Sequence, residues 1–239
     1  MKKKDIVMIV PVYNEQEVLE QNITKLYNYA KRYLVSNFSI VISDSLSTDE
    51  TESISKSLVD RYAEVKYIRL NKRGKGLAIR ETQKHFQADW FCFIDADLPV
   101  PLHYLKILEN IILTDRFDLI IGNRHGRKSN LVASPLRKFV SICYLNLAKL
   151  ILFDFRIQDL QAGFKAWNNN IKNNIFPLVT NEKWFFDTEL VYHSFNKNMK
   201  IKYFPITYYL EVEGERQSKV NLFKSSFQFF INLIRLRFS

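Results

Sequence analysis

The first half of the chain alternates short apolar runs with longer segments whose apolar residues recur at helical spacing. Residues 6–10 (IVMIV) form an uninterrupted apolar run that ends at Pro11, which is typical of a buried parallel strand. Residues 15–33 carry apolar side chains three or four positions apart, which predicts a helix. The alternation continues with strands predicted at 38–42, 65–70 and 90–94, and with helices at 50–62 and 76–86.

This alternation predicts an α/β fold with a mostly parallel sheet and crossover helices on both faces. In the second half of the chain, residues 119–122 and 204–210 predict two further strands. Ser134 followed by Pro135 is a typical helix start, and residues 136–153 follow it with apolar side chains around most of the helix circumference.

The last predicted helix, residues 221–239, is amphipathic. Its polar residues recur every three or four positions, so they form one narrow stripe on a surface of Phe, Leu and Ile. We therefore expect a main domain over residues 1–218 and a C-terminal membrane-associating helix over residues 219–239. Helix 136–153 is either a second helix lying in a membrane interface or a core helix packed on the sheet.

Composition places the chain among ordinary globular proteins. It has 239 residues, of which 47% are hydrophobic and 25% charged, so one domain with a substantial core is expected. Its two cysteines, Cys92 and Cys143, are too few for a disulfide framework or a zinc site and fit a reducing, cytosolic setting.

The net charge of +10 is concentrated in two segments, residues 116–149 and 216–239. Both segments are also apolar and aromatic, which suits lipid headgroups better than the polar surface of a nucleic-acid-binding protein. No apolar run reaches the roughly 18 residues needed to span a bilayer, and the N-terminus lacks the pattern of a signal peptide. We expect a cytoplasmic protein attached peripherally to the cytosolic face of a membrane, with no nucleic-acid partner.

Polar clusters follow each of the first four predicted strands, at the sheet edge where α/β proteins bind ligands. The sharpest is Asp95-Ala96-Asp97, directly after the strand at 90–94. Two carboxylates one residue apart can hold Mg²⁺ or Mn²⁺, whose remaining ligands are water and phosphate oxygens. The alternative is a pair of solvated loop aspartates.

These clusters resemble the nucleotide-sugar site of family 2 glycosyltransferases with the GT-A fold. The motifs concerned are residues 11–15 (PVYNE), 44–51 (DSLSTDET), 73–76 (RGKG) and 95–97 (DAD). Later motifs are similar to the branch that acts on polyprenyl phosphate, which includes dolichyl-phosphate mannosyl- and glucosyltransferases. They are residues 122–124 (GNR), the pair Arg137 and Ser141, residues 159–165 (DLQAGFK), 184–190 (WFFDTEL) and 218–220 (SKV).

The resemblance implies a role for each matching residue. The nucleotide sugar would be bound by Pro11, Tyr13, Glu15, Asp44, Lys75, Asp95, Ala96, Asp97, Arg216 and Lys219. Asp95 and Asp97 would hold the metal, and with Arg124 they form the catalytic set. The acceptor phosphate would be bound by Arg124, Arg137 and Ser141, and the sugar by Asp159, Asp187 and Glu189.

The reaction implied is inverting transfer of a hexose from a nucleotide diphosphate sugar to polyprenyl or dolichyl phosphate, with glucose favoured over mannose. A phosphate acceptor is already ionised, so the enzyme needs cations that position it rather than a strong base. A transferase acting on a glycan hydroxyl would instead need a carboxylate base, for which Asp159 or Asp187 would serve. A nucleotide-sugar-binding protein without turnover is a further alternative.

Two positions depart from the family pattern. Ser45 stands where the family often has a second aspartate, and Pro99 stands where some relatives carry a glutamine metal ligand. Water or phosphate oxygens would have to replace that glutamine in the coordination shell.

Overall fold

The fold is seen in a computed structural model, which describes residues 3–210 and 222–238, with the backbone alone for 222–227. The predicted first-half strands form a parallel array in the order β3-β2-β1-β4. Their bounds are β1 Asp5–Val12, β2 Asn37–Asp44, β3 Val65–Arg69 and β4 Trp90–Ile94. The crossover helices are α1 Leu19–Tyr33, α2 Thr51–Arg61 and α3 Lys75–His85, and α4 His103–Ile112 follows β4.

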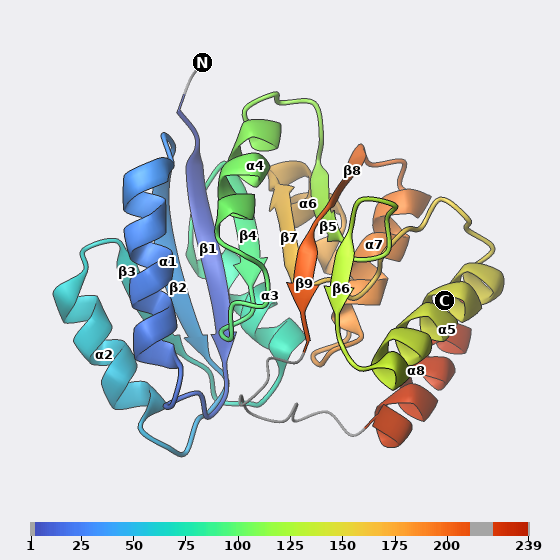
Figure 1. Cartoon of the computed structure of the whole chain (residues 1–239), viewed down its shortest axis with the longest axis horizontal. Helices are drawn as coiled ribbons and strands as arrows, with labels where there is room; N and C mark the ends of the chain where they lie inside the picture. The colour runs from blue at the N-terminus through green and yellow to red at the C-terminus, as the bar shows by residue number, and fades with distance from the viewer. Residues whose placement is uncertain (1–2, 211–221, 239) are drawn as a thin grey trace.

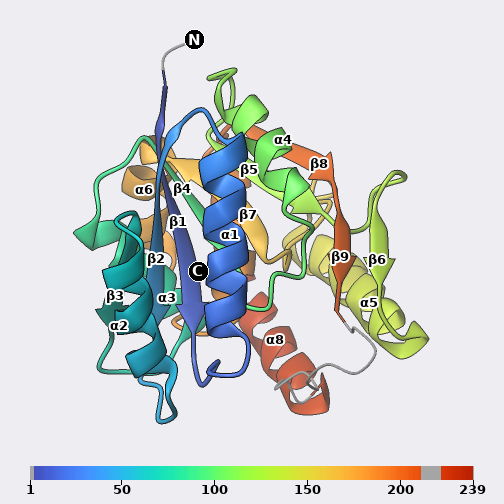
Figure 2. The ribbon, with the colours of Figure 1, turned by 60° about the vertical axis from the view of Figure 1, so that its left-hand side comes forward.

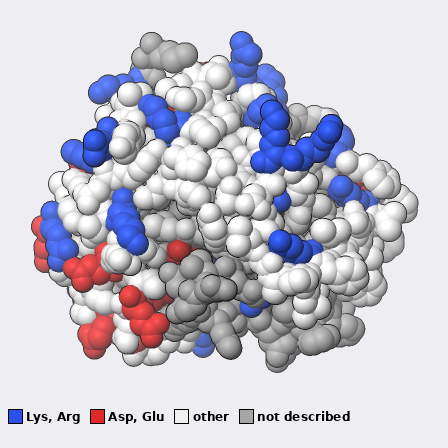
Figure 3. Space-filling model, in the orientation of Figure 1, with Lys and Arg blue, Asp and Glu red and all other residues white. Residues whose placement is uncertain are grey.

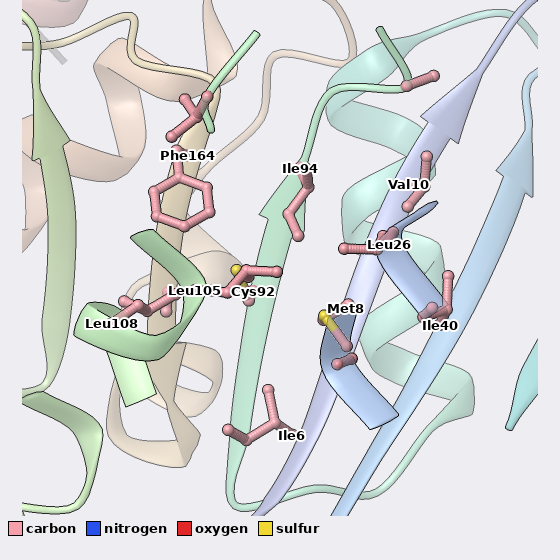
Figure 4. Packing of buried hydrophobic residues seen from close by; sticks show 14 of the residues in the cluster. Ile6, Met8, Val10, Leu26, Ile40, Cys92, Ile94, Leu105, Leu108 and Phe164 are labelled. Atoms are coloured by element: carbon pink, nitrogen blue, oxygen red, sulfur yellow. The ribbon is translucent and has the colours of Figure 1, made fainter. Parts of the chain in front are cut away.

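Side chains of the sheet alternate between two hydrophobic clusters, one on each face. On β1, Met8 and Val10 belong to the cluster shared with α1 and α4, and Val7 and Ile9 belong to the cluster on the other face. Figure 4 shows the first cluster, in which Leu26 of α1 covers the strands. This alternation is what a period of two dictates for strands covered by helices on both faces, so the α/β prediction is confirmed.

Three later strands complete the sheet, whose full order is β3-β2-β1-β4-β7-β5-β8. They are β5 Leu119–Asn123, β7 Phe164–Asn168 and β8 Ile201–Pro205. β7 is antiparallel to both its neighbours, and the other pairings in the sheet are parallel. The sheet is therefore mostly parallel, as predicted, but the sequence pattern gave no sign of β7, which was read only as part of a motif.

The single strand predicted at 204–210 is wrong, because two strands share that segment. β8 ends at Pro205, which has no backbone N–H to donate. After Ile206 the chain forms β9 Thr207–Tyr209, which pairs with β6 Asn130–Val132 in a separate two-stranded sheet. Ile206 joins the sheets, since its N–H donates to Asn123 O and its carbonyl accepts from the Asn130 N–H.

The second half also supplies helices that cover the far face. They are α5 Pro135–Leu152, α6 Asn169–Asn174, α7 Phe186–Asn196 and α8 Leu222–Arg237, with a short 3₁₀ helix at Phe176–Leu178. Figures 1 and 2 show α5 and α8 side by side at one end of the molecule, away from α1 and α2. Among the described residues, no helix is both long and apolar enough to cross a bilayer.

Helices α5 and α8 each bury one side and expose another. Leu145, Ala148 and Leu152 of α5 pack in the second cluster together with Leu233 and Leu236 of α8. The exposed apolar side chains on these two helices and just beyond their ends are Leu136, Phe139, Ile142, Leu147, Leu150, Phe153, Phe155, Phe230, Ile234 and Phe238. Each helix therefore packs on the core through one side, as the core-helix alternative predicts, and exposes apolar side chains on its outer side. The domain boundary predicted at residue 218 lies outside the described residues.

Candidate functional site

The predicted polar clusters meet at the carboxyl ends of β1, β2 and β4. Pro11 and Val12 of β1 stand in register with Ser43 and Asp44 of the parallel strand β2. In Figure 1 these strand ends lie at the lower edge of the sheet, near the start of α3. Because the strands run in the same direction, the topology gathers residues distant in sequence at one edge.

Asp44 organises the loop on the nucleotide side of this edge. Its carboxylate is fully buried and accepts hydrogen bonds from Ser47 N (2.8 Å) and from the Tyr67 hydroxyl (2.8 Å). Burial, followed by the bond to Asp44, raises the pKa of Tyr67 and keeps it a hydrogen-bond donor. Tyr67 lies on β3 and carried no sequence signal beyond its place in a predicted strand.

The loop after β1 contacts the loops after β2 and β3. The backbone N–H groups of Asn14 and Glu15 donate to the hydroxyls of Ser47 (3.0 Å) and Thr51 (2.9 Å). The guanidinium of Arg73 lies 3.7 Å from the centre of the Tyr13 ring, a cation–π contact. Arg73 was part of a recognised motif but not of the predicted site, and it stands beside the aromatic residue expected to hold the base.

The glycines of the RGKG motif allow a second-half segment to approach this loop. A Cβ at Gly76 would lie 2.5 Å from Asn181 O and 2.7 Å from the Phe186 Cβ. The Leu77 N–H donates to Glu182 O at 3.0 Å, which ties the start of α3 to residues 181–186. Lys75 is held at this junction, between the rings of Phe93 and Trp184, each centred 4.6 Å from its Nζ.

The Asp95 and Asp97 carboxylates follow β4 as predicted. Asp95 Oδ1 lies 2.6 Å from Lys75 Nζ, and Oδ2 accepts from the Tyr208 hydroxyl at 3.2 Å. Asn22 of α1 donates to Ala96 O at 2.9 Å and holds the turn between the two aspartates. The surrounding protein atoms and the charge of Asp95 raise the pKa of Asp97 to about 7, although its side chain reaches the surface.

This carboxylate pair fits a hard divalent cation. The Lys75 ammonium already places positive charge against Asp95, and Asp97 points to the surface with no ion-pair partner within 4 Å among the described residues. In the described ranges, no third acidic, His or Cys side chain joins this pair. A cation here would therefore need phosphate or water oxygens to complete its shell, as Mg²⁺ commonly does.

At the end of β5, Arg124 forms a buried two-pronged ion pair with Asp159. Arg124 donates from Nε and Nη2 to the two carboxylate oxygens of Asp159, both at 2.8 Å. Burial opposes ionisation of Asp159, but the guanidinium outweighs it and lowers the pKa of this carboxyl to about 2. The sequence assigned these residues to phosphate and to sugar separately, and the structure brings them together.

Of the two predicted acceptor residues on α5, Ser141 lies next to the segment that contains Arg124. Its hydroxyl is 3.2 Å from Nε2 of His125, the residue after Arg124. Arg137 Nη1 is 3.5 Å from Leu210 O. His125 adjoins the GNR motif but is not among the predicted site residues, and the fold places it beside Ser141.

The two carboxylates on α7 are bound by other side-chain and backbone groups of the protein. Asp187 is buried 2.5 Å from the Nζ of Lys165, which also donates to Leu160 O and Ala162 O. Glu189 accepts from the N–H groups of Thr180 (2.7 Å) and Asn181 (2.8 Å). As placed, both organise loops around the site, while Arg216 and Lys219 lie outside the described residues.

Ser45 and Pro99, the two departures from the family pattern, both form hydrogen bonds with neighbouring loops. Ser45 donates from its backbone to Val12 O at 2.9 Å and from its hydroxyl to Gly74 O at 3.2 Å. Pro99 accepts from the Tyr209 N–H at 2.8 Å and so connects the loop after Asp97 to β9. Each stabilises a loop of the site.

A profile of the family described as Glycosyl transferase family 2 matches residues 7–186. Among curated proteins, the chain is similar to "Dolichyl-phosphate beta-glucosyltransferase" of Dictyostelium discoideum, with 28% identity across 97% of this chain and 73% of that protein. It is 27% identical to the Saccharomyces cerevisiae protein of the same name, across 88% of this chain and 68% of that one.

Solved structures with a similar fold include glucosyl-3-phosphoglycerate synthase from Mycobacterium tuberculosis. Its complex with uridine diphosphate superposes with a TM-score of 0.70 at 16% identity and covers 98% of this chain and 80% of that chain. A further structure of that enzyme, with Mn²⁺, uridine diphosphate and phosphoglyceric acid, superposes with a TM-score of 0.71. At this level of identity the likeness concerns the fold.

Proposed function

Because the chain belongs to glycosyltransferase family 2 and has its GT-A-like fold, we propose that it transfers glucose from a nucleotide diphosphate sugar to dolichyl or another polyprenyl phosphate. The similarity to two proteins named dolichyl-phosphate beta-glucosyltransferase, across 97% and 88% of this chain, supports this choice of donor sugar and acceptor. The site is a hexosyltransferase site whose parts come from both halves of the chain.

One observation favours a phosphate acceptor over a glycan hydroxyl. Asp159 and Asp187, which the sequence indicated as candidates for a general base, are buried in ion pairs with Arg124 and Lys165. A carboxylate with a pKa of about 2, as at Asp159, is a weak base near neutral pH. A phosphate monoester needs no such base, because it is already an anionic nucleophile.

The donor would bind across the ends of β1, β2 and β4. Tyr13 and Arg73 offer a stacked surface for the nucleotide base, with the loop organised by Asp44 beside them. Lys75 lies where negative charge would grow on the diphosphate as the glycosidic bond breaks. A divalent cation held by Asp95 and Asp97, Mg²⁺ or Mn²⁺, would supply further positive charge to that leaving group.

The acceptor phosphate would bind near the loop after β5 and the start of α5. Ser141 lies beside His125, the residue after Arg124, and Arg137 is one turn earlier on the same helix. A guanidinium matches phosphate geometry. Arg124 remains oriented by Asp159 on its other side. An acceptor oxygen attacks the anomeric carbon as the nucleoside diphosphate departs from the opposite face, which inverts the configuration.

The outer apolar sides of α5 and α8 would lie on the cytosolic face of a membrane, where a polyprenyl acceptor is found. Phe139 and Leu150 are 65% and 59% exposed on α5, and basic Lys138 stands beside Phe139. Aromatic and aliphatic side chains with adjacent cations are typical of helices at a lipid interface. Cys92 and Cys143 are both free thiols, which fits the cytosolic side.

The test is a transfer assay with vesicles containing dolichyl phosphate, radiolabelled UDP-glucose and Mg²⁺ or Mn²⁺. We expect a labelled lipid, with GDP-mannose a poorer donor, and at least a tenfold loss of rate in D95N and D97N. Asp115→Asn, at an exposed aspartate remote from the site, is the matched control. Metal-dependent nucleotide binding without labelled lipid, whichever sugar nucleotide is supplied, would favour a binding protein instead.

A further inference from the structure

Tyr208 lies between the donor and acceptor sides of the site, although no motif pointed to it. It is on β9, its side chain is only 5% exposed, and its hydroxyl donates to Asp95 Oδ2 at 3.2 Å. The guanidinium of Arg124 lies over its ring, 5.3 Å from the ring centre. One side chain therefore contacts both a proposed metal ligand and the central acceptor-side cation.

The hydroxyl of Tyr208 decides how the Asp95 carboxylate is turned. Lys75 is bound to Oδ1, so Oδ2 is the oxygen that Tyr208 engages. Gly163 lies against the same group: a Cβ there would be 2.8 Å from the Tyr208 hydroxyl and closer still to Asp95 Oδ2. Asp95 thus has little space to rotate, and a hydrogen bond fixes one of its oxygens.

The residues before and after Tyr208 in the chain are both fixed by hydrogen bonds of their backbone N–H groups. The Thr207 N–H donates to the Tyr104 hydroxyl at 3.0 Å, and the Tyr209 N–H donates to Pro99 O at 2.8 Å. Its position is therefore set by the backbone of β9, independently of any bound substrate.

We propose that Tyr208 is a positioning residue for the divalent-cation site, acting by orienting Asp95 through this hydrogen bond. The inference rests on the proposed function, since it concerns the cation that would accompany the nucleotide sugar. Groups that orient metal ligands from outside the coordination shell commonly change metal affinity by about 10- to 100-fold.

The experiment uses two calorimetric titrations of the full chain: Mn²⁺ at a saturating concentration of uridine diphosphate, and uridine diphosphate in EDTA. For Y208F we expect the Mn²⁺ affinity to fall roughly 10- to 100-fold while nucleotide affinity in EDTA stays at the wild-type value. Tyr27→Phe is the matched control, because it removes a phenol hydroxyl that donates to Glu64, between α2 and β3, and does not reach Asp95. Its Mn²⁺ affinity should remain that of the wild type.

Tyr208→Leu provides a second variant, whose side chain has no polar atom to bond Asp95, and melting curves establish that the variants are folded. Mn²⁺ affinity at the wild-type level in the folded variants would overturn the inference while leaving the proposed function intact. Wild-type protein whose nucleotide binding ignores Mn²⁺ would overturn both the inference and the metal requirement of the proposed function.

Discussion

Buried ion pairs set the chemistry of individual side chains in this site. Arg124 pairs with Asp159, Lys165 pairs with Asp187, and both pairs are almost entirely shielded from water. Such pairs are weak sources of stability, but losing one partner leaves a costly unpaired charge. We therefore expect both pairs to be essential for the arrangement of the site without taking part in proton transfer.

Asp159 should make the unfolding free energy of the protein depend on pH in the acidic range. Its pKa of about 2 is below the unfolded value of 3.8, so its ion pair stabilises the fold above about pH 4. That contribution, roughly 2 kcal/mol, is lost as the pH falls toward 2. Urea unfolding should show the stability gap between wild type and D159N narrowing over this range.

Asp115→Asn is the control for that comparison, because the Asp115 side chain is 68% exposed. Its unfolding free energy should follow the wild-type curve at every pH. A gap between wild type and D159N that stays constant from pH 4 to pH 2 would contradict the assigned pKa.

Lys165 should be costly to remove alone and less costly to remove with its partner. K165M leaves the buried Asp187 carboxylate unpaired, and we expect a loss of about 3–5 kcal/mol in unfolding free energy. K165M/D187L removes both charges and should be more stable than K165M in urea unfolding. Losses that simply add would mean that the two charges are not coupled.

Among the elements, α5 and α8 differ most from ordinary surface helices. They pack against each other and on the sheet through one side, yet α5 alone exposes Leu136, Phe139, Ile142, Leu147 and Leu150. A contiguous exposed apolar surface of this kind is unusual in a water-soluble protein and marks an interaction surface. The bilayer is the partner proposed above for this surface.

F139S/L150S should weaken binding to vesicles of anionic phospholipid, measured by flotation, by tenfold or more because two exposed apolar anchors are lost. The melting temperature should stay close to that of the wild type, since neither side chain packs in the core. The matched control is Y33S/V35S, which alters two exposed apolar residues at the end of α1 and just after it. Equal vesicle binding by both double variants would show that α5 does not contact lipid.

In the whole molecule, the two halves of the chain contribute to opposite sides of one site. The parallel first half presents the loops proposed to bind the nucleotide, and β5, β7 and α5 supply the residues proposed to bind the acceptor. Figure 3 shows acidic side chains gathered on the α2 side of the molecule, whereas basic side chains are spread over both halves of this view.

Nucleotide and metal together should stabilise the whole fold. At a uridine diphosphate concentration near 100 times its dissociation constant, with saturating Mn²⁺, mass action adds about 2.7 kcal/mol, or roughly 5–10 °C in melting temperature. We expect a smaller shift with guanosine diphosphate, and D95N/D97N should lose the Mn²⁺-dependent part. A larger shift with guanosine diphosphate would argue against UDP-glucose as donor.

Local patterns in the sequence were enough for the parallel half of the fold and for its ligand-binding edge. Apolar runs such as residues 6–10, each followed by an amphipathic helix, leave few alternatives to a parallel sheet. The Asp95 and Asp97 pair was visible because both carboxylates follow one strand. The sequence did not predict β7, because its first residues were assigned to the motif at 159–165 and its apolar stretch is short. This strand pairs in the antiparallel sense with both neighbours.

Contacts between distant segments depended on the tertiary structure. The sequence indicated a sugar ligand or a general base at Asp159. In the folded structure this residue pairs with Arg124, which lies 35 residues earlier in the chain. No sequence pattern indicated Tyr208, because its hydroxyl contacts Asp95, which lies 113 residues earlier in the chain. Sequence patterns report the periodicity of neighbouring residues, whereas side-chain partners are chosen by the packing of strands that meet only after the chain has folded.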